Sequence, residues 1–194
     1  VDRLTRSDRL GAIFILCPPE QAGACRDLLH GTKAVVQAVQ ADPPSWASLV
    51  RPARKWSLDG WRGGLGGTAS FDEYTDARVL AGILAASPAE AVLSDPAAAP
   101  AIDPALVDRM IQHAGKIGEE SRLIFTQSPP GVAGILLRAD LVRELADKQI
   151  AIGWIFAYKP DDPMKDLIFQ PSLCEVPQDL RYASGRLIAD TDRS

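Results

Sequence analysis

Apolar residues in this chain fall into short continuous runs, which alternate with stretches where apolar residues recur every three or four positions. Continuous runs are typical of strands buried on both faces of a sheet, and the wider spacing is typical of amphipathic helices. We predict strands at residues 12–17, 33–39, 91–93, 122–126, 132–137 and 150–158, and a last short apolar piece at 186–189. We predict helices at residues 4–10, 19–30, 76–84, 104–113 and 140–148. The alternation indicates an α/β domain with a mostly parallel sheet.

Two of these segments fit a second interpretation. Residues 33–39 also fit a short helix, and we favour the strand because it follows a predicted helix. Residues 150–158 also fit a buried turn followed by a strand. The later part of the chain departs from strict strand–helix alternation, so we expect the sheet to be mixed.

The stretch at 91–111 organises the rest of the chain. A short apolar strand at 91–93 is closed by Asp95 and Pro96, and Asp103 followed by Pro104 is a strong helix start signal. The predicted helix at 140–148 begins in the same way, with Asp140 as its cap. In open α/β sheets, ligands bind beyond the carboxyl ends of the strands. We therefore expect the loop at 95–103 to border any ligand site.

Composition narrows the class of protein. The 194 residues suit one domain, and the net charge of −4 gives no reason to expect nucleic acid or an acidic membrane surface as partner. No apolar run reaches the roughly 18 residues of a membrane span, and the polar first ten residues show no signal peptide. Three cysteines without metal-ligand spacing, Cys17, Cys25 and Cys174, are expected to be reduced thiols in a cytoplasmic protein.

The glycine-rich stretch at 60–67, GWRGGLGG, is a candidate ligand loop. It does not match a P-loop, and Ala69 stands where a dinucleotide fingerprint needs its third glycine. Glycine still lets the backbone approach a ligand closely, and Arg62 suits a phosphate or carboxylate. The alternative is a loop without a ligand beside a buried Trp61.

Polar groups after the predicted strands are the other candidates. Asp95 and Asp190 each lie at a strand end, and carboxylates from two strand ends can hold Mg²⁺ while phosphate oxygens complete its coordination. The alternative is that Asp95 is a turn residue and Asp190 a surface charge. Asp103 is explained fully by its role as a helix cap. Gln127, in the polar tip at 126–131, fits contact with a base or sugar edge, or plain turn chemistry.

Three pieces of the chain together resemble sugar nucleotidyltransferases with the GT-A-like fold, and most closely the cytidylyltransferases of the spore-coat polysaccharide type. The segment from Asp95, D-P-x-x-x-P-x-I-D-P-x-L-V-D, resembles that family's G-D-x-P-L-I-D-P-x-L-I-D. W-R-G-G at 61–64 resembles its F-R-G. R-L-I-A-D-T at 186–191 resembles its C-terminal R-L-T-V-D-T, whose Asp is a metal ligand in that fold. The three pieces have the family's order and spacing and cover most of the chain.

The resemblance implies a three-layer α/β/α sandwich over a single domain, 1–194. It implies transfer of a nucleotidyl group, with CMP favoured, from a nucleoside triphosphate to a sugar or sugar acid, with Mg²⁺ as cofactor. The attack on the α-phosphate would be in line, with pyrophosphate leaving. The expected metal ligands are Asp95 and Asp190, and the expected substrate-binding residues are Arg62, Gly63, Gly64 and Gln127.

The chain departs from the family pattern in three respects, one of which is that the family's usual Lys or Arg phosphate contacts are not identifiable beyond Arg62. The family's first strand and its Gly/Arg-rich loop would lie before Val1, so we expect the chain to lack them. Alignment on Asp103 and Pro104 puts Ala98 where the family has its first metal Asp, and Asp95 lies three residues earlier. These departures leave open an inactive domain, a domain of a longer protein with a fused partner, or a homodimer.

Two other functions compete with a transferase. One is a non-catalytic nucleotide- or sugar-binding module that regulates a fused partner, and the other is a scaffolding α/β domain without a small-molecule site. A flavodoxin-like or Rossmann sheet is the rival fold, and the order of the strands separates it from the GT-A-like sheet.

Overall fold

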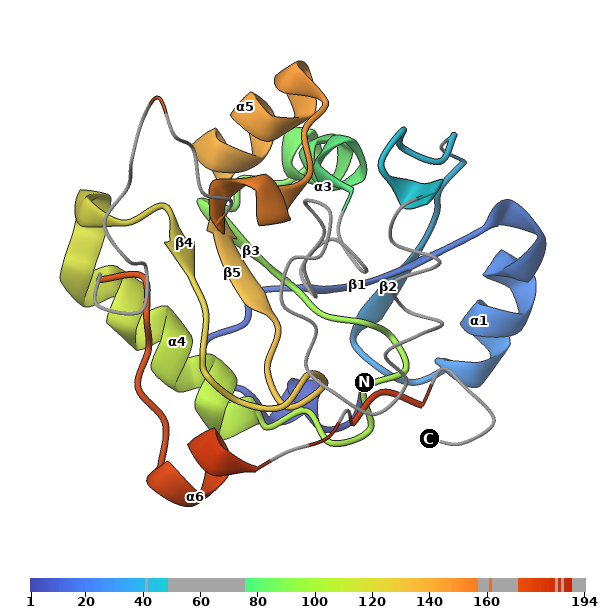
Figure 1. The fold of residues 1–194 in the computed structure, drawn as a ribbon. Helices are drawn as coiled ribbons and strands as arrows, with labels where there is room; N and C mark the ends of the chain where they lie inside the picture. Colours follow the sequence, from blue (N-terminus) through green and yellow to red (C-terminus); the bar gives the residue numbers. More distant parts are fainter. Residues whose placement is uncertain are drawn as a thin grey trace.

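The computed structural model describes residues 1–40, 42–48, 76–156, 161, 171–183, 185 and 187–189. Within these residues the chain is a mixed α/β protein with two small sheets (Figure 1). In the first sheet β1 (Ile13–Cys17) pairs in parallel with β2 (Ala34–Ala38). In the second, β5 (Ile135–Arg138) lies between β3 (Ala91–Ser94) and β4 (Leu123–Ile124) and is antiparallel to both. Both sheets consist of segments that the sequence predicts as strands.

In chain order the helices within the described residues are η1 (Leu4–Arg6), η2 (Pro19–Gln21), α1 (Ala22–Leu28), α3 (Ala77–Ala85), α4 (Pro104–Ile117), η5 (Gly118–Glu120), α5 (Ala139–Lys148), η6 (Ile152–Phe156) and α6 (Gln178–Tyr182). Of these, α1, α3, α4 and α5 lie at predicted positions, the predicted helix at 4–10 is only the short η1, and α6 and η6 were not predicted as helices. In the part of the chain that the structure describes, none of them is long and apolar enough to cross a membrane.

Two helices begin at capping carboxylates, and one of these caps, Asp103, is predicted from the sequence. The Asp76 carboxylate accepts the backbone N–H of Arg78 at 3.0 Å, and the Asp103 carboxylate accepts that of Ala105 at the same distance. The prediction that Asp140 caps α5 is wrong, because Arg138 is the N-cap residue and Asp140 lies inside the first turn. An acidic side chain there still interacts favourably with the helix dipole.

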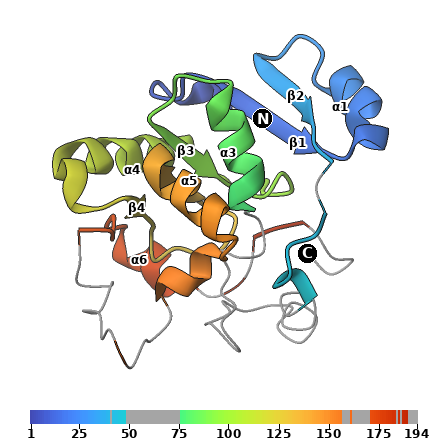
Figure 2. The same ribbon diagram turned by 90° about the horizontal axis from the view of Figure 1, so that it is seen from above.

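Helices cover both faces of the three-stranded sheet. On one face, Ile135 and Leu137 of β5 pack with buried residues of α3 and α5, and α3 and α5 lie side by side (Figures 1 and 2). On the other face, Leu136 packs with Met110 of α4 and with Cys174. Successive residues of a strand point to opposite faces, so a continuous apolar run is what a strand covered on both sides requires.

The direction of β5 differs from the expected mostly parallel sheet. Residues 125–134 join β4 to β5 without an intervening helix, whereas a parallel return needs a crossover of about a dozen residues or more, usually helical. The connection contains Pro129, Pro130 and Gly131, with Gly131 at φ 94°. The chain therefore turns back, and β5 runs antiparallel to its neighbours.

Of the two interpretations of residues 150–158, an uninterrupted strand is wrong, since Ile152–Phe156 is a 3₁₀ helix. The strand that the second interpretation puts after a buried turn is not tested, because residues 157–158 lie outside the described residues. Gln149 ends α5 in the left-handed region at φ 53°, and the N–H of Ile150 donates to the carbonyl of Leu145 at 3.2 Å. The chain folds back onto α5 at once, and Ile152 is buried in the core. An apolar run of this length does not distinguish a buried turn from a buried strand.

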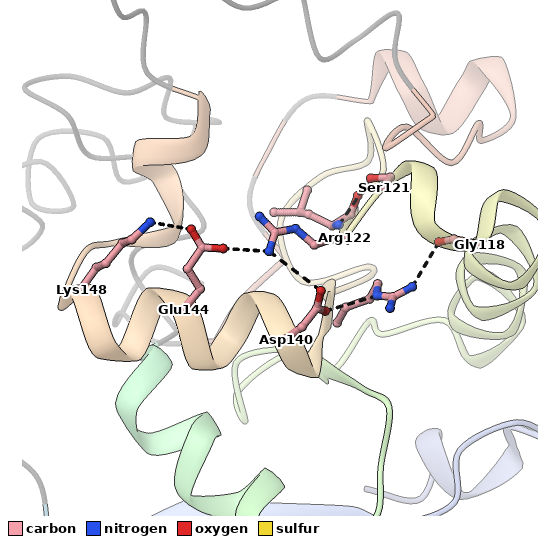
Figure 3. A network of polar contacts seen from close by, with 8 residues as sticks. Gly118, Ser121, Arg122, Asp140, Glu144 and Lys148 are labelled. Atoms are coloured by element: carbon pink, nitrogen blue, oxygen red, sulfur yellow. Dashed lines mark hydrogen bonds and ion pairs between the residues drawn. The ribbon is translucent and has the colours of Figure 1, made fainter. Parts of the chain in front are cut away.

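A surface network of charges ties the start of β4 to α5 (Figure 3). The Arg122 guanidinium lies 2.7 Å from the Glu144 carboxylate and 3.8 Å from that of Asp140, and Lys148 donates to Glu144 at 2.6 Å. Hydrogen bonds from Lys148 and Arg122 lower the pKa of Glu144 to about 2. Because the groups are open to water, the network contributes little to the free energy of unfolding.

Candidate functional site

A cleft of about 1780 Å³ opens between the two sheets and is the candidate site. Its walls are β1, β3, the inner side of α3 and the beginning of the loop that follows β3. Asp95, the first residue of that loop, lines it. The cleft thus reaches the carboxyl end of β3, where the sequence places a ligand site.

Asp95 is the most unusual polar residue of the cleft. Its Oδ1 atom is buried and has no hydrogen-bond partner in the described part of the chain. Removal from water raises the pKa of this carboxyl from 3.8 to about 7. A buried carboxylate oxygen without a partner is unfavourable for folding alone, and such groups gather at functional sites.

Three segments that are distant in sequence meet around this loop. The N–H of Ala189 donates to the carbonyl of Ala98 at 2.7 Å, and the N–H of Leu187 donates to that of Pro130 at 2.8 Å. The N–H of Asp103 donates to the carbonyl of Val132 at 2.8 Å. The loop after β3, the connection between β4 and β5, and the piece at 187–189 therefore form one hydrogen-bonded unit.

Two glycines allow this unit to close. A Cβ on Gly134 would lie 2.1 Å from the carbonyl oxygen of Ser94 and 3.0 Å from the Asp95 Cβ. A Cβ on Gly131 would lie 2.3 Å from the carbonyl oxygen of Leu187. Gly131 belongs to the polar tip at 126–131 that the sequence indicates, whereas Gly134 was not predicted, although an isolated glycine in an apolar run indicates a bulge or a close backbone approach.

The predicted site residues fall into two groups. Arg62, Gly63, Gly64 and Asp190 lie outside the described residues. Asp95 lines the cleft as expected, whereas Gln127 is not among the residues that line it. The described segment before Asp190 ends at Ala189, which is bonded to the loop after β3.

The fit of a metal ion rests on Asp95. No group of three or more potential ligands from His, Cys, Asp and Glu occurs within the described ranges. The Asp103 carboxylate is engaged as the cap of α4. Mg²⁺ commonly uses only one or two protein carboxylates and takes its other oxygens from water and phosphates, so Asp95 fits as one such ligand.

A smaller groove of about 500 Å³ runs along α4 and carries both signs of charge. It is lined by Asp108, Arg109, His113 and Lys116, with Cys174 beneath. The His113 Nε2 atom is already bonded to the carbonyl of Pro171 at 2.7 Å. The mixed charges do not favour one class of ligand, so the cleft with Asp95 is the stronger candidate.

Neither the family models nor the curated proteins nor the solved structures contain a match to this chain. The geometry of the cleft and the resemblance of three sequence pieces to sugar nucleotidyltransferases are therefore the basis for inferring a function.

Proposed function

We propose that this chain is a nucleotidyltransferase-like domain of GT-A type, which transfers a nucleotidyl group, with CMP favoured, from a nucleoside triphosphate to a sugar or sugar acid. The observation that carries the proposal is the buried Oδ1 of Asp95, which lies at the carboxyl end of β3 on the wall of a large cleft and has no hydrogen-bond partner among the described residues. The bond from Ala189 to Ala98 supports it further, because the C-terminal piece that resembles the family's metal segment then adjoins the same loop.

Asp95 and Asp190 would hold Mg²⁺ in this proposal. The ion would neutralise charge on the triphosphate when bound. A carboxyl group must lose its proton to bind a cation, and the pKa of Asp95 is raised to about 7. Magnesium binding should therefore release a proton and strengthen as the pH rises through 7.

The chain's own contribution would be to hold the two substrates in line. Arg62, Gly63 and Gly64 are the proposed phosphate contacts, because glycine permits close backbone approach and arginine pairs with phosphate oxygens. Positioning of this kind supplies a large part of the rate in a bimolecular transfer. Burial of Asp95 would increase the rate further, since its carboxylate and a bound cation interact more strongly away from water.

The alternative is a non-catalytic nucleotide- or sugar-binding module that regulates a fused partner domain. The raised pKa of Asp95 favours it, because the carboxyl group is largely neutral below pH 7. A neutral carboxyl group can donate a hydrogen bond to a sugar hydroxyl or a base. Binding without release of pyrophosphate would then be the outcome.

Calorimetry and a pyrophosphate assay separate the two functions. CTP and the other nucleoside triphosphates are titrated with and without Mg²⁺, and pyrophosphate release is followed with sugar phosphates and sugar acids as acceptors. Asp95→Asn should weaken magnesium-dependent CTP binding at least about tenfold, the equivalent of 1.4 kcal/mol. Asp103→Asn is the matched control, because asparagine caps a helix as well as aspartate.

Each outcome decides between the proposals. Binding and pyrophosphate release that both depend on Asp95 support the transferase. Binding that depends on Asp95 without pyrophosphate release supports the binding module. Absence of binding to every triphosphate refutes the transferase, and absence of binding to triphosphates and to the same sugar phosphates and sugar acids titrated alone refutes the binding module. Equal binding by parent and Asp95→Asn refutes both.

A further inference from the structure

Two of the three cysteines lie close together at one end of the two-stranded sheet. Cys17 is the last residue of β1, and Cys25 lies in α1, which follows β1 after a short connection. The Cys17 thiol is within hydrogen-bonding reach of the Cys25 thiol, and both are free cysteines in this structure. The third cysteine, Cys174, lies elsewhere, in the core around Met110. The fold therefore places one pair of thiols side by side.

The backbone around the pair explains why the two residues meet. The carbonyl of Cys17 accepts the N–H of Val39 at 2.9 Å, which holds the end of β1 beside the end of β2. The helix α1 packs against β2 (Figure 1). On α1, Ala22 is buried and Cys25, one turn later, is half-buried, whereas the three residues that follow Cys25 are exposed. Cys25 thus lies on the helix face that is turned toward the sheet.

The two thiols differ in their access to solvent. Cys25 is half-buried, so a small reagent can reach it, whereas Cys17 is only 7% exposed. Burial, together with the neighbouring Cys25 thiol, raises the pKa of Cys17. The thiolate is the reactive form of cysteine. Cys25 is therefore the thiol that reacts first with a reagent from solution, and Cys17 the one that reacts second.

We propose that Cys17 and Cys25 form a reversible disulfide by exchange with a small-molecule disulfide. The Cys25 sulfur loses its proton and attacks one sulfur of the reagent, whose S–S bond breaks, and one small thiol leaves after taking up a proton. The Cys17 sulfur then loses its proton and attacks the Cys25 sulfur, and the second small thiol leaves in the same way. The two cysteines lose two electrons, and the reagent gains them.

The disulfide would act on the rim of the large cleft. Cys17 and the residue after it, Pro18, line that cleft, and the new bond would close a loop over residues 17–25. A closed loop restricts the unfolded chain and so stabilises the folded one. In a reducing compartment, disulfides of this kind are usually transient and respond to oxidation. The inference rests on the thiol pair and does not depend on nucleotidyl transfer.

Redox titration of the 194-residue protein tests the proposal. The protein is equilibrated with mixtures of reduced and oxidised glutathione, the remaining thiols are alkylated after unfolding, and the chain is cut with trypsin. Both cysteines of the pair fall in one tryptic peptide, residues 10–26. As the mixture becomes more oxidising, this peptide should lose both alkyl labels together, while Cys174 keeps its label. Dithiothreitol should restore both labels.

Thermal unfolding provides the second measurement. The oxidised protein should melt about 5 °C or more above the reduced protein, because the disulfide closes a short loop. Cys25→Ser should remove this difference. Cys174→Ala is the matched control, since it removes a buried cysteine outside the pair, and it should keep the difference between the oxidised and reduced forms.

Several results would overturn the proposal. They are a lasting mixed disulfide of Cys25 with glutathione while Cys17 stays free, chains linked to one another through cysteine, a disulfide that includes Cys174, and two labels retained under every mixture. If Cys25→Ser does not fold, the peptide labels of the unsubstituted protein still decide. None of these results bears on CTP binding, so a failure here is distinct from a failure of the proposed function.

Discussion

β5 and β1 are both short, apolar strands, and they differ in how far the fold buries them. β5 lies between two strands and two helix layers, and its first three residues are fully buried. Among the described residues β1 has one neighbouring strand, and four of its five residues are only partly buried. The same sequence pattern thus gives a fully covered central strand in the three-stranded sheet and a partly exposed edge strand in the two-stranded sheet of the described chain.

The difference shows that an apolar run predicts which segment gains stability from burial, but does not predict how far the folded chain buries it. Each Å² of apolar surface that folding removes from water stabilises the folded state by about 25 cal/mol. A strand that is only half covered therefore lacks part of this stabilisation. The part of the molecule around β1 is therefore the place where a bound ligand would stabilise the chain most.

The largest effect is expected from truncating the centre of β5. The Leu137 side chain has no exposed surface, so Leu137→Ala should lower the free energy of unfolding by about 4–5 kcal/mol, the upper end of the range for buried leucines. Ile15→Ala on β1 should lower it by about 2 kcal/mol in the 194-residue chain. Urea unfolding measures both, and equal losses would remove the contrast.

The next effect concerns Asp95, where the two halves meet. Burial raises its pKa to about 7, so between pH 4 and pH 7 the native chain keeps a proton that the unfolded chain releases. The free energy of unfolding should therefore fall as the pH rises through this window, by up to about 4 kcal/mol at 1.36 kcal/mol per pKa unit. This loss of stability is expected for the protein without bound Mg²⁺, in which the Asp95 carboxylate has no cation to neutralise it.

Asp95→Asn should remove that loss. The variant should resemble the parent at pH 4 and exceed it in stability at pH 8, as measured by urea unfolding across the range. Asp103→Asn should keep the pH dependence of the parent. A parent and Asp95→Asn with parallel pH profiles would show that the carboxyl group is not withdrawn from water.

A smaller effect is expected at the contact between β3 and β5. In Gly134→Ala the new methyl group would meet the Ser94 carbonyl, and the local shift should lower the free energy of unfolding by about 1–3 kcal/mol. Gly82→Ala in α3 has open space and should raise it by about 0.5–1 kcal/mol, because alanine favours a helix. Thermal unfolding of the two variants should shift in opposite directions.

The smallest effect is expected at the surface of α5. The ion pairs lower the pKa of Glu144 to about 2, so their contribution to stability is present above pH 4.5 and lost as the pH falls toward 2. Glu144→Gln should be slightly less stable than the parent at pH 7 and equal to it at pH 2. Glu119→Gln, an exposed change in η5, is the control. An effect as large as that of Gly134→Ala would contradict the solvent-exposed nature of the network.

The sequence by itself determined the local features of this protein. The starts of α3 and α4 follow from Asp76 and Asp103, because a capping carboxylate bonds to an N–H only two residues away. Each of β1 to β5 lies within or close to a predicted apolar run for the same reason, since the run is contiguous in the chain. Asp95 was identified as a site candidate from its place after a strand.

The tertiary structure alone decided the features that depend on distant partners. The reversal of β5, the 3₁₀ helix at Ile152–Phe156 and the bond from Ala189 to Ala98 each depend on which segments pack together. Within the described ranges, the lack of a hydrogen-bond partner at Asp95 Oδ1 and the edge position of β1 are likewise set by what surrounds them. A local pattern specifies which surface a segment must cover, whereas burial and pairing are properties of the neighbours that the folded chain supplies.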